Sequence, residues 1–117
     1  MKIRDIVQKL ELKVISGDDL LDRKITGGYV SDMLSDVIAH AEEGHIWITL
    51  QTHLNVIPVA SMKAISGIII VNDRQPDEET LKKAKEEQVP ILGTEMKAFH
   101  VVGKLYQLGI SGQDEDL

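Results

Sequence analysis

Short polar segments follow three apolar runs of the sequence, and each run has the composition of a β-strand. The segments are Gln51-Thr52-His53, Asn72-Asp73 and Gly93-Thr94. In open α/β sheets the carboxyl ends of parallel strands lie at one edge, and ligands bind there. Hydroxyl, amide and imidazole groups can hold a ligand, but they also cap helices and satisfy the backbone at strand ends. The pattern predicts a ligand site at this edge, with a purely structural role as the alternative.

A fourth polar segment, Thr26-Gly27-Gly28, follows Arg23 and precedes an expected helix. Paired glycines are typical of a turn that other residues do not tolerate. In the functional alternative, they let the backbone approach an anion that faces N–H groups at the helix start, and Arg23 adds charge. The structural alternative for Arg23 is an ion pair with Asp22 or Asp32. We expect this segment to lie at the same edge, where helix N-termini favour a phosphate-bearing ligand.

The motifs of catalysis are missing from the sequence. No G-x-x-x-x-G-K-[ST] loop is present to cradle phosphates, and no G-x-S-x-G turn presents a serine nucleophile. The chain has no cysteine, and its four histidines lack the spacing of a zinc site. We therefore expect no catalytic residue, no cofactor and no metal.

Charge and hydropathy exclude two further classes of partner. The chain has 19 acidic and 13 basic residues and a net charge of -6, which repels a nucleic acid. The longest uninterrupted apolar run, 68–71, is far shorter than the roughly 20 residues of a membrane span. Residues 1–10 carry charges throughout and do not resemble a signal peptide. We expect a cytoplasmic protein that binds neither nucleic acid nor membrane.

Apolar periodicity predicts alternating helices and strands. Expected strands are 12–15, an extended piece that starts at Ile25 and runs into Gly27-Gly28, 46–50, 68–71 and 89–92. Expected helices lie at 1–10, 30–41, 55–60, 76–88 and 94–106. Ser31 or Asp32 should cap the second helix, whose buried stripe runs from Val30 through Met33 and Ile38. Phe99 and Tyr106 should point inward from the last helix. Side chains expected to be buried are Trp47, Ile48, Ile69, Ile70, Val37 and Val102.

This order predicts an α/β fold with a mostly parallel central sheet flanked by helices. Residues 1–110 should form a single domain, and 111–117 an acidic tail. Because a domain of 117 residues buries a modest fraction of its surface, we expect a homodimer.

Several segments together resemble the DRTGG domain. They are residues 21–32, 44–53, 68–71, 90–94 and 103–106, so the likeness covers roughly residues 10 to 110. The resemblance implies a fold like the N-terminal domain of HPr kinase/phosphorylase, without the kinase domain. Such domains occur as small separate proteins and as regulatory inserts near CBS domains or beside phosphotransacetylase. Small members are sometimes labelled serine kinases, a label that the missing P-loop argues against.

The sequence leaves three classes of function open. The first is a non-catalytic regulatory or sensing domain that binds a small phosphate-bearing ligand, such as the adenine nucleotide suggested by the family's neighbours. The second is a protein–protein interaction or assembly module without a small ligand. The third is an enzyme whose active site matches no known motif. Expected ligand-binding residues are Arg23, Thr26, Gly27, Gly28, Gln51, Thr52, His53, Asn72 and Thr94.

Overall fold

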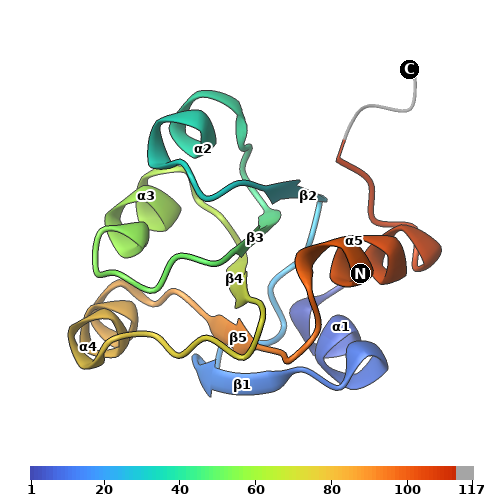
Figure 1. The fold of residues 1–117 in the computed structure, drawn as a ribbon, viewed down its shortest axis with the longest axis horizontal. Helices are drawn as coiled ribbons and strands as arrows, with labels where there is room; N and C mark the ends of the chain where they lie inside the picture. Colours follow the sequence, from blue (N-terminus) through green and yellow to red (C-terminus); the bar gives the residue numbers. More distant parts are fainter. Residues whose placement is uncertain (113–117) are drawn as a thin grey trace.

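One five-stranded sheet organises the molecule (Figure 1). The structure, a computed structural model, describes residues 1–112. Its strands are β1 (Lys13–Ser16), β2 (Gly27–Val30), β3 (His45–Thr49), β4 (Gly67–Ile70) and β5 (Ile91–Gly93). Their spatial order is β1-β5-β4-β3-β2, and only β1 runs antiparallel to its neighbour. The predicted α/β class with a mostly parallel sheet is confirmed.

Helices cover both faces of the sheet. They are α1 (Ile3–Leu10), α2 (Leu34–His40), α3 (Val56–Met62), α4 (Glu78–Glu87) and α5 (Ala98–Gln107). Apolar side chains of α1 and α5 pack on one face, and those of α2, α3 and α4 pack on the other. No helix within residues 1–112 has the length and apolar character needed to cross a membrane.

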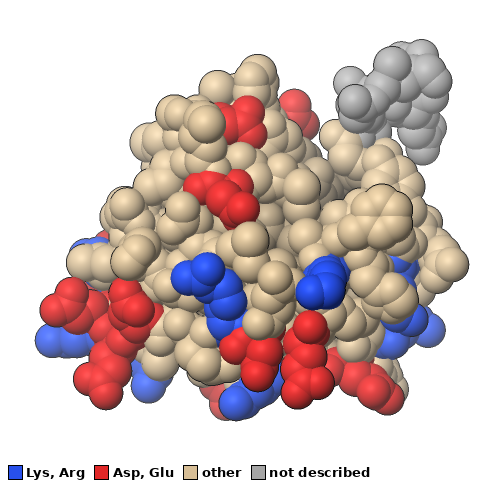
Figure 2. Space-filling view, viewed as in Figure 1, with Lys and Arg blue, Asp and Glu red and all other residues tan. Residues whose placement is uncertain are grey.

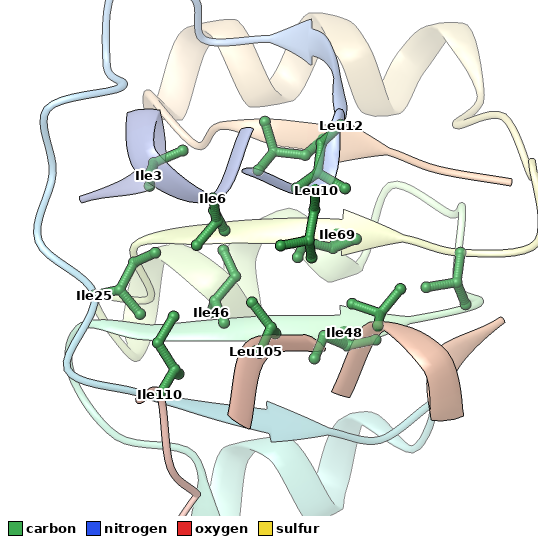
Figure 3. Packing of buried hydrophobic residues seen from close by; sticks show 13 residues of the cluster. Ile3, Ile6, Leu10, Leu12, Ile25, Ile46, Ile48, Ile69, Leu105 and Ile110 are labelled. Carbon is green, nitrogen blue, oxygen red and sulfur yellow. The ribbon is translucent and has the colours of Figure 1, made fainter. Parts of the chain in front are cut away.

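Branched aliphatic side chains build both cores. Figure 3 shows Ile46 and Ile48 of β3 beside Ile69 of β4 in the core under α1 and α5. Every residue of β3 and β4 is buried, because helices cover both of their faces. Of the six side chains expected to be buried, five are buried and Val102 is only partly buried. The five are Val37, Trp47, Ile48, Ile69 and Ile70.

Gly27 and Gly28 lie inside strand β2, so the predicted turn is wrong. Neither glycine has a positive φ. A Cβ on Gly27 would lie 2.8 Å from the carbonyl oxygen of Ser111 and 3.1 Å from Nε2 of His45. Glycine is needed at position 27 because two other parts of the chain approach its backbone closely.

The second helix begins later than expected because polar side chains hold the residues before it in a turn. The Ser31 hydroxyl accepts the N–H of Met33, and the Asp32 carboxylate lies toward β3. Neither residue is the N-cap. Val30 and Met33 are consequently 48% and 64% exposed, and Ile38 is also exposed.

Helix α5 is rotated relative to its predicted phase. Val101 and Leu105 point into the core, whereas Phe99 is 93% and Tyr106 56% exposed. The two stripes have the same helical spacing, so periodicity alone does not select between them.

The expected tail begins with ordered contacts. Gly28 N–H donates to the Ser111 carbonyl at 3.1 Å, and Gly112 N–H donates to the Tyr106 hydroxyl at 3.3 Å. The rest of the expected tail, 113–117, lies outside the described residues.

Candidate functional site

The carboxyl ends of β3, β4 and β5 form one edge of the sheet, as the sequence predicts. The loops after β4 and β5 are hydrogen-bonded to each other there. Asn72 N–H donates to the Met96 carbonyl at 3.0 Å, and Asp73 N–H donates to the Thr94 carbonyl at 2.8 Å. Asn72 and Asp73 both have left-handed backbones, with φ of 60° and 56°. Asn and Asp tolerate this conformation better than most residues, and such strain is common at functional sites.

The Gln51-Thr52-His53 segment lies at this edge, where its groups make structural contacts. The Gln51 side-chain amide donates to the Asp32 carbonyl at 2.9 Å. Thr52 is buried, and its carbonyl accepts the Thr80 hydroxyl at 2.8 Å. His53 is exposed and lies 3.3 Å from the Asp77 carboxylate. Of the three, only His53 presents its side chain largely to solvent.

Asp32 fixes the end of β3. Its Oδ1 accepts the Thr49 hydroxyl at 2.9 Å and the Leu50 N–H at 2.7 Å. A carboxylate with two such donors is an anchor for the loop. This role replaces both of the roles that the sequence suggests for Asp32, the helix cap and the ion pair with Arg23.

A groove of about 680 Å³ opens at the end of β5. We call it the carboxyl-edge groove. Its cationic lining residues come from three separate elements: Lys9 from α1, Lys13 from β1 and Lys104 from α5. Thr94 and Asp73 line it as well, so it includes part of the predicted edge. The remaining lining residues are Leu10, Glu11, Ile15, Gln75, Gly93, Glu95 and Met96.

The helix N-termini at this edge differ in the charges of their first turns. The first turn of α4 carries Glu78 and Glu79, which oppose an anion at that helix N-terminus. The first turn of α5, beside the groove, carries no acidic residue. The groove lining contains three lysines together with Glu11, Asp73 and Glu95, so it is balanced in charge and the lysines supply its cationic hydrogen-bond donors.

Thr26-Gly27-Gly28 and Arg23 lie at the opposite, amino edge of the sheet, so their expected place beside the other segments is wrong. Gly27 begins β2 and pairs with His45, the first residue of the parallel strand β3. A separate hollow of about 560 Å³ here is lined by Arg23 and Thr26, near the ends of α3 and α4. Helix C-termini carry partial negative charge, so the predicted attraction of an anion to helix N-termini does not apply here.

His45, the first residue of β3, is a buried titratable side chain beside Gly27 of β2. Its Nδ1 accepts the Glu42 N–H at 3.2 Å, and its Nε2 lies 3.9 Å from the Glu42 carboxylate. Burial lowers the pKa of His45 below its ordinary value, and the Glu42 charge opposes this only in part. The neutral ring is therefore the form that fits the fold. Within residues 1–112 no group of three or more His, Cys, Asp or Glu side chains could hold a metal ion.

The sequence model of the DRTGG domain matches residues 5–108. The chain belongs to the DRTGG domain family. Its fold is similar to the crystal structure of the CBS and DRTGG domains of the regulatory region of Clostridium perfringens pyrophosphatase, complexed with the activator diadenosine tetraphosphate. The TM-score is 0.63 at 15% sequence identity, and the match covers 86% of this chain but 44% of that one. No curated protein sequence matches the chain.

Residues 21–32, the first segment that resembles the DRTGG domain and hereafter its signature, join the N-terminus to the sheet. Arg4 Nε lies 3.0 Å from the Asp22 carboxylate, and this bond lowers the pKa of Asp22. The Lys24 carbonyl accepts the Ser66 hydroxyl, and the Thr26 hydroxyl donates to the Glu43 carbonyl at 2.8 Å. These bonds give the signature a structural explanation.

Sequence reasoning missed the three lysines of the carboxyl-edge groove. Lys9 and Lys13 are close together near the N-terminus, but Lys104 is far from both in the chain, and no local motif joins the three. They meet because β1 pairs with β5 and α1 and α5 share a face of the sheet. The one available signal is that Lys104 belongs to the segment 103–106, which contributes to the DRTGG likeness.

Proposed function

We propose that this DRTGG domain is a non-catalytic regulatory or sensing domain of the cytoplasm that binds a small phosphate-bearing ligand in the carboxyl-edge groove. The observation that carries the proposal is the convergence of Lys9, Lys13 and Lys104 on one groove at the end of a parallel strand. Each ammonium group offers three N–H donors, and phosphate oxygens are their natural acceptors. The balancing carboxylates favour a ligand held by specific contacts over nonspecific attraction of polyanions.

An adenine nucleotide is the specific form of ligand that we propose. Leu10, Ile15 and Met96 line the same groove and offer apolar contacts to a base. No aromatic ring is among the lining residues, so the base has no stacking partner and the affinity should be modest. The regulatory region of the structurally similar pyrophosphatase was crystallised with an adenine-containing activator, which supports this choice of ligand class.

Of the residues predicted from the sequence, this proposal retains Thr94 and includes the neighbouring Asp73. Asn72 contributes through the loop that its N–H fixes to Met96. Thr52 is buried and Gln51 is engaged with Asp32, so they support the edge without contacting the ligand. His53 and the motif residues at the amino edge lie outside the groove lining.

The test is titration of the protein with ATP, AMP, diadenosine tetraphosphate and adenosine, followed by backbone amide NMR shifts. Shifts should centre on Lys13, Thr94 and Met96, and adenosine should produce weaker ones because it lacks phosphate. Changing Lys13 or Lys104 to Met should weaken nucleotide binding about tenfold, as expected for loss of one charge-assisted hydrogen bond. Lys82→Met on α4 is the matched control, since Lys82 is exposed and outside the groove.

Two results would reject the ligand proposal. One is the absence of shifts at millimolar nucleotide, and the other is a set of shifts centred on the Arg23 hollow that the groove variants leave unchanged. The former would favour the assembly-module alternative, for which the exposed apolar side chains of α5 are the supporting observation. In either function we propose that the chain acts as a homodimer.

A further inference from the structure

An uncharged stripe runs along the exposed side of α5. It contains Phe99, Val102, Gly103 and Tyr106, whose spacing of three and four residues places them on one side of a helix. Phe99 is 93% exposed and Tyr106 56%, although both carry large apolar rings. In Figure 2 the Lys and Arg side chains lie over the lower half of the molecule and acidic side chains appear in both halves, while the surface between α5 and β2 is largely free of both.

An apolar groove of about 260 Å³ adjoins this stripe. We call it the β2–α5 groove. Val30 and Ile48 line it from the sheet, and Val102, Leu105 and Tyr106 line it from the helix. The stripe therefore carries both a projecting ring, Phe99, and a hollow of a size suited to an aromatic ring.

Helix α5 also contains a glycine, Gly103, on its exposed side. A glycine inside a helix is about 1 kcal/mol less favourable than alanine, so it needs a reason. Its surroundings within residues 1–112 supply none, because φ is not positive at Gly103 and an added Cβ would meet nothing within 4 Å. A glycine on an exposed helix face permits another helix to approach closely.

We propose that the stripe is the interface of a twofold homodimer in which α5 packs antiparallel against α5 of a second copy. The midpoint of Phe99 and Tyr106 falls between Val102 and Gly103. A twofold axis at that point sets Phe99 opposite the partner's Tyr106, where the ring enters the partner's β2–α5 groove. The same contact repeats on the other side, as an isologous interface requires. Gly103 lies at the crossing, where the two backbones come closest.

The two exposed rings of the stripe are large enough to form the centre of a contact with a second copy, with polar surface around them supplying the rest. An aromatic side chain offers roughly 200 Å², so Phe99 and Tyr106 together expose about 300 Å² in each copy. A standard interface buries about 800 Å² per partner, and these two rings would form its apolar centre. The lack of charge on the stripe also matters, because each copy carries a net charge of -6 and must pair through a neutral surface.

This inference rests on the homodimer proposed above and is independent of the nucleotide. The test uses analytical ultracentrifugation and single-cysteine crosslinking of the full chain. The wild type should sediment at twice 13.0 kDa at micromolar concentration. Phe99→Ala should weaken dimerisation at least tenfold, while its thermal unfolding when diluted to monomer should stay unchanged because the ring is exposed. Met62→Ala is the matched control, since Met62 is also exposed but lies on α3, across the sheet.

Crosslinking tests the twofold axis directly. The chain has no cysteine, so Gly103→Cys introduces a unique thiol beside the proposed axis, and mild oxidation should join two copies through it. Met62→Cys should give no such product. A monomeric wild type would reject both the homodimer and the surface. If Phe99→Ala left the dimer intact, or if Met62→Cys crosslinked instead, the homodimer would stand but this surface would be rejected as its interface.

Discussion

A matched pair of substitutions tests whether the signature glycines serve packing or ligand binding. Gly27 and Gly28 are neighbours in β2, and neither has a positive φ, so alanine is conformationally acceptable at both. Their surroundings differ. A Cβ at position 27 would lie 2.8 Å from a backbone oxygen of Ser111, whereas at position 28 the nearest atom is Cγ2 of Ile46 at 3.5 Å. The first distance requires the backbone to move, and the second is ordinary van der Waals contact.

The expected magnitude follows from two opposing effects. Overpacking against a backbone atom costs about 2 kcal/mol, and it also weakens the bond from Gly28 N–H to the Ser111 carbonyl. Replacing glycine by alanine restricts the unfolded chain and returns about 0.7 kcal/mol. Gly27→Ala should therefore lose about 1.3 kcal/mol of unfolding free energy, while Gly28→Ala should be neutral or gain up to about 0.7 kcal/mol.

Urea unfolding followed by tryptophan fluorescence measures the difference. Trp47 is the single tryptophan and is fully buried, so its emission reports loss of the core. With an m-value of about 1.5 kcal/mol per M, Gly27→Ala should lower the midpoint by about 0.9 M. Equal midpoints for both variants would refute the packing argument. If Gly27→Ala kept full stability and lost nucleotide binding, the signature would belong to a ligand site.

Two further predictions concern buried polar groups. Thr80→Val should lose about 1 kcal/mol of unfolding free energy in urea, because the fully buried hydroxyl donates to the Thr52 carbonyl. The loss is modest because that carbonyl still accepts the Asp77 N–H in the variant. A variant as stable as the wild type would contradict this. For His45 the folded pKa is lowered, so the unfolded chain takes up a proton near its ordinary pKa of about 6.5 while the folded chain does not. Stability should therefore fall as the pH drops below about 6.5, and urea midpoints of His45→Asn should lack this part of the pH dependence.

Much of the fold could be predicted because burial on two faces leaves a direct mark on sequence. The run 68–71 contains only branched apolar residues, and β4 is covered on both faces. Helix α3 begins at Val56, one residue after the start expected from the sequence, and Asn55 before it makes no side-chain capping bond. Where two apolar stripes compete on one helix, as on α5, the sequence offers no basis for choosing. The prediction that Phe99 points inward is wrong for this reason.

The site could be predicted only in part because sequence carries no direct record of strand order. The polar segments after β3, β4 and β5 share an edge, as parallel pairing requires. The sequence also predicts that Gly27-Gly28 lies at this edge, because paired glycines suggest a turn after a strand. In the structure these two glycines are instead the first two residues of strand β2. Sequence does not separate a glycine needed for a positive φ from one needed for close approach. The groove lysines depend on the antiparallel pairing of β1 with β5, which no local pattern encodes.

The position of β1 has a consequence for how the chain folds during synthesis. Among the five strands of this sheet, β1 is synthesised first and its partner β5 last. Helix α1 likewise shares its core with α5, so Ile6 and Leu10 have no complete packing surface until the final helix is made. Contacts between such distant segments form slowly and leave apolar surface open meanwhile. The apolar face of the N-terminal segment therefore stays uncovered until α5 and β5 are made, and the sheet is complete only when its last strand pairs with its first.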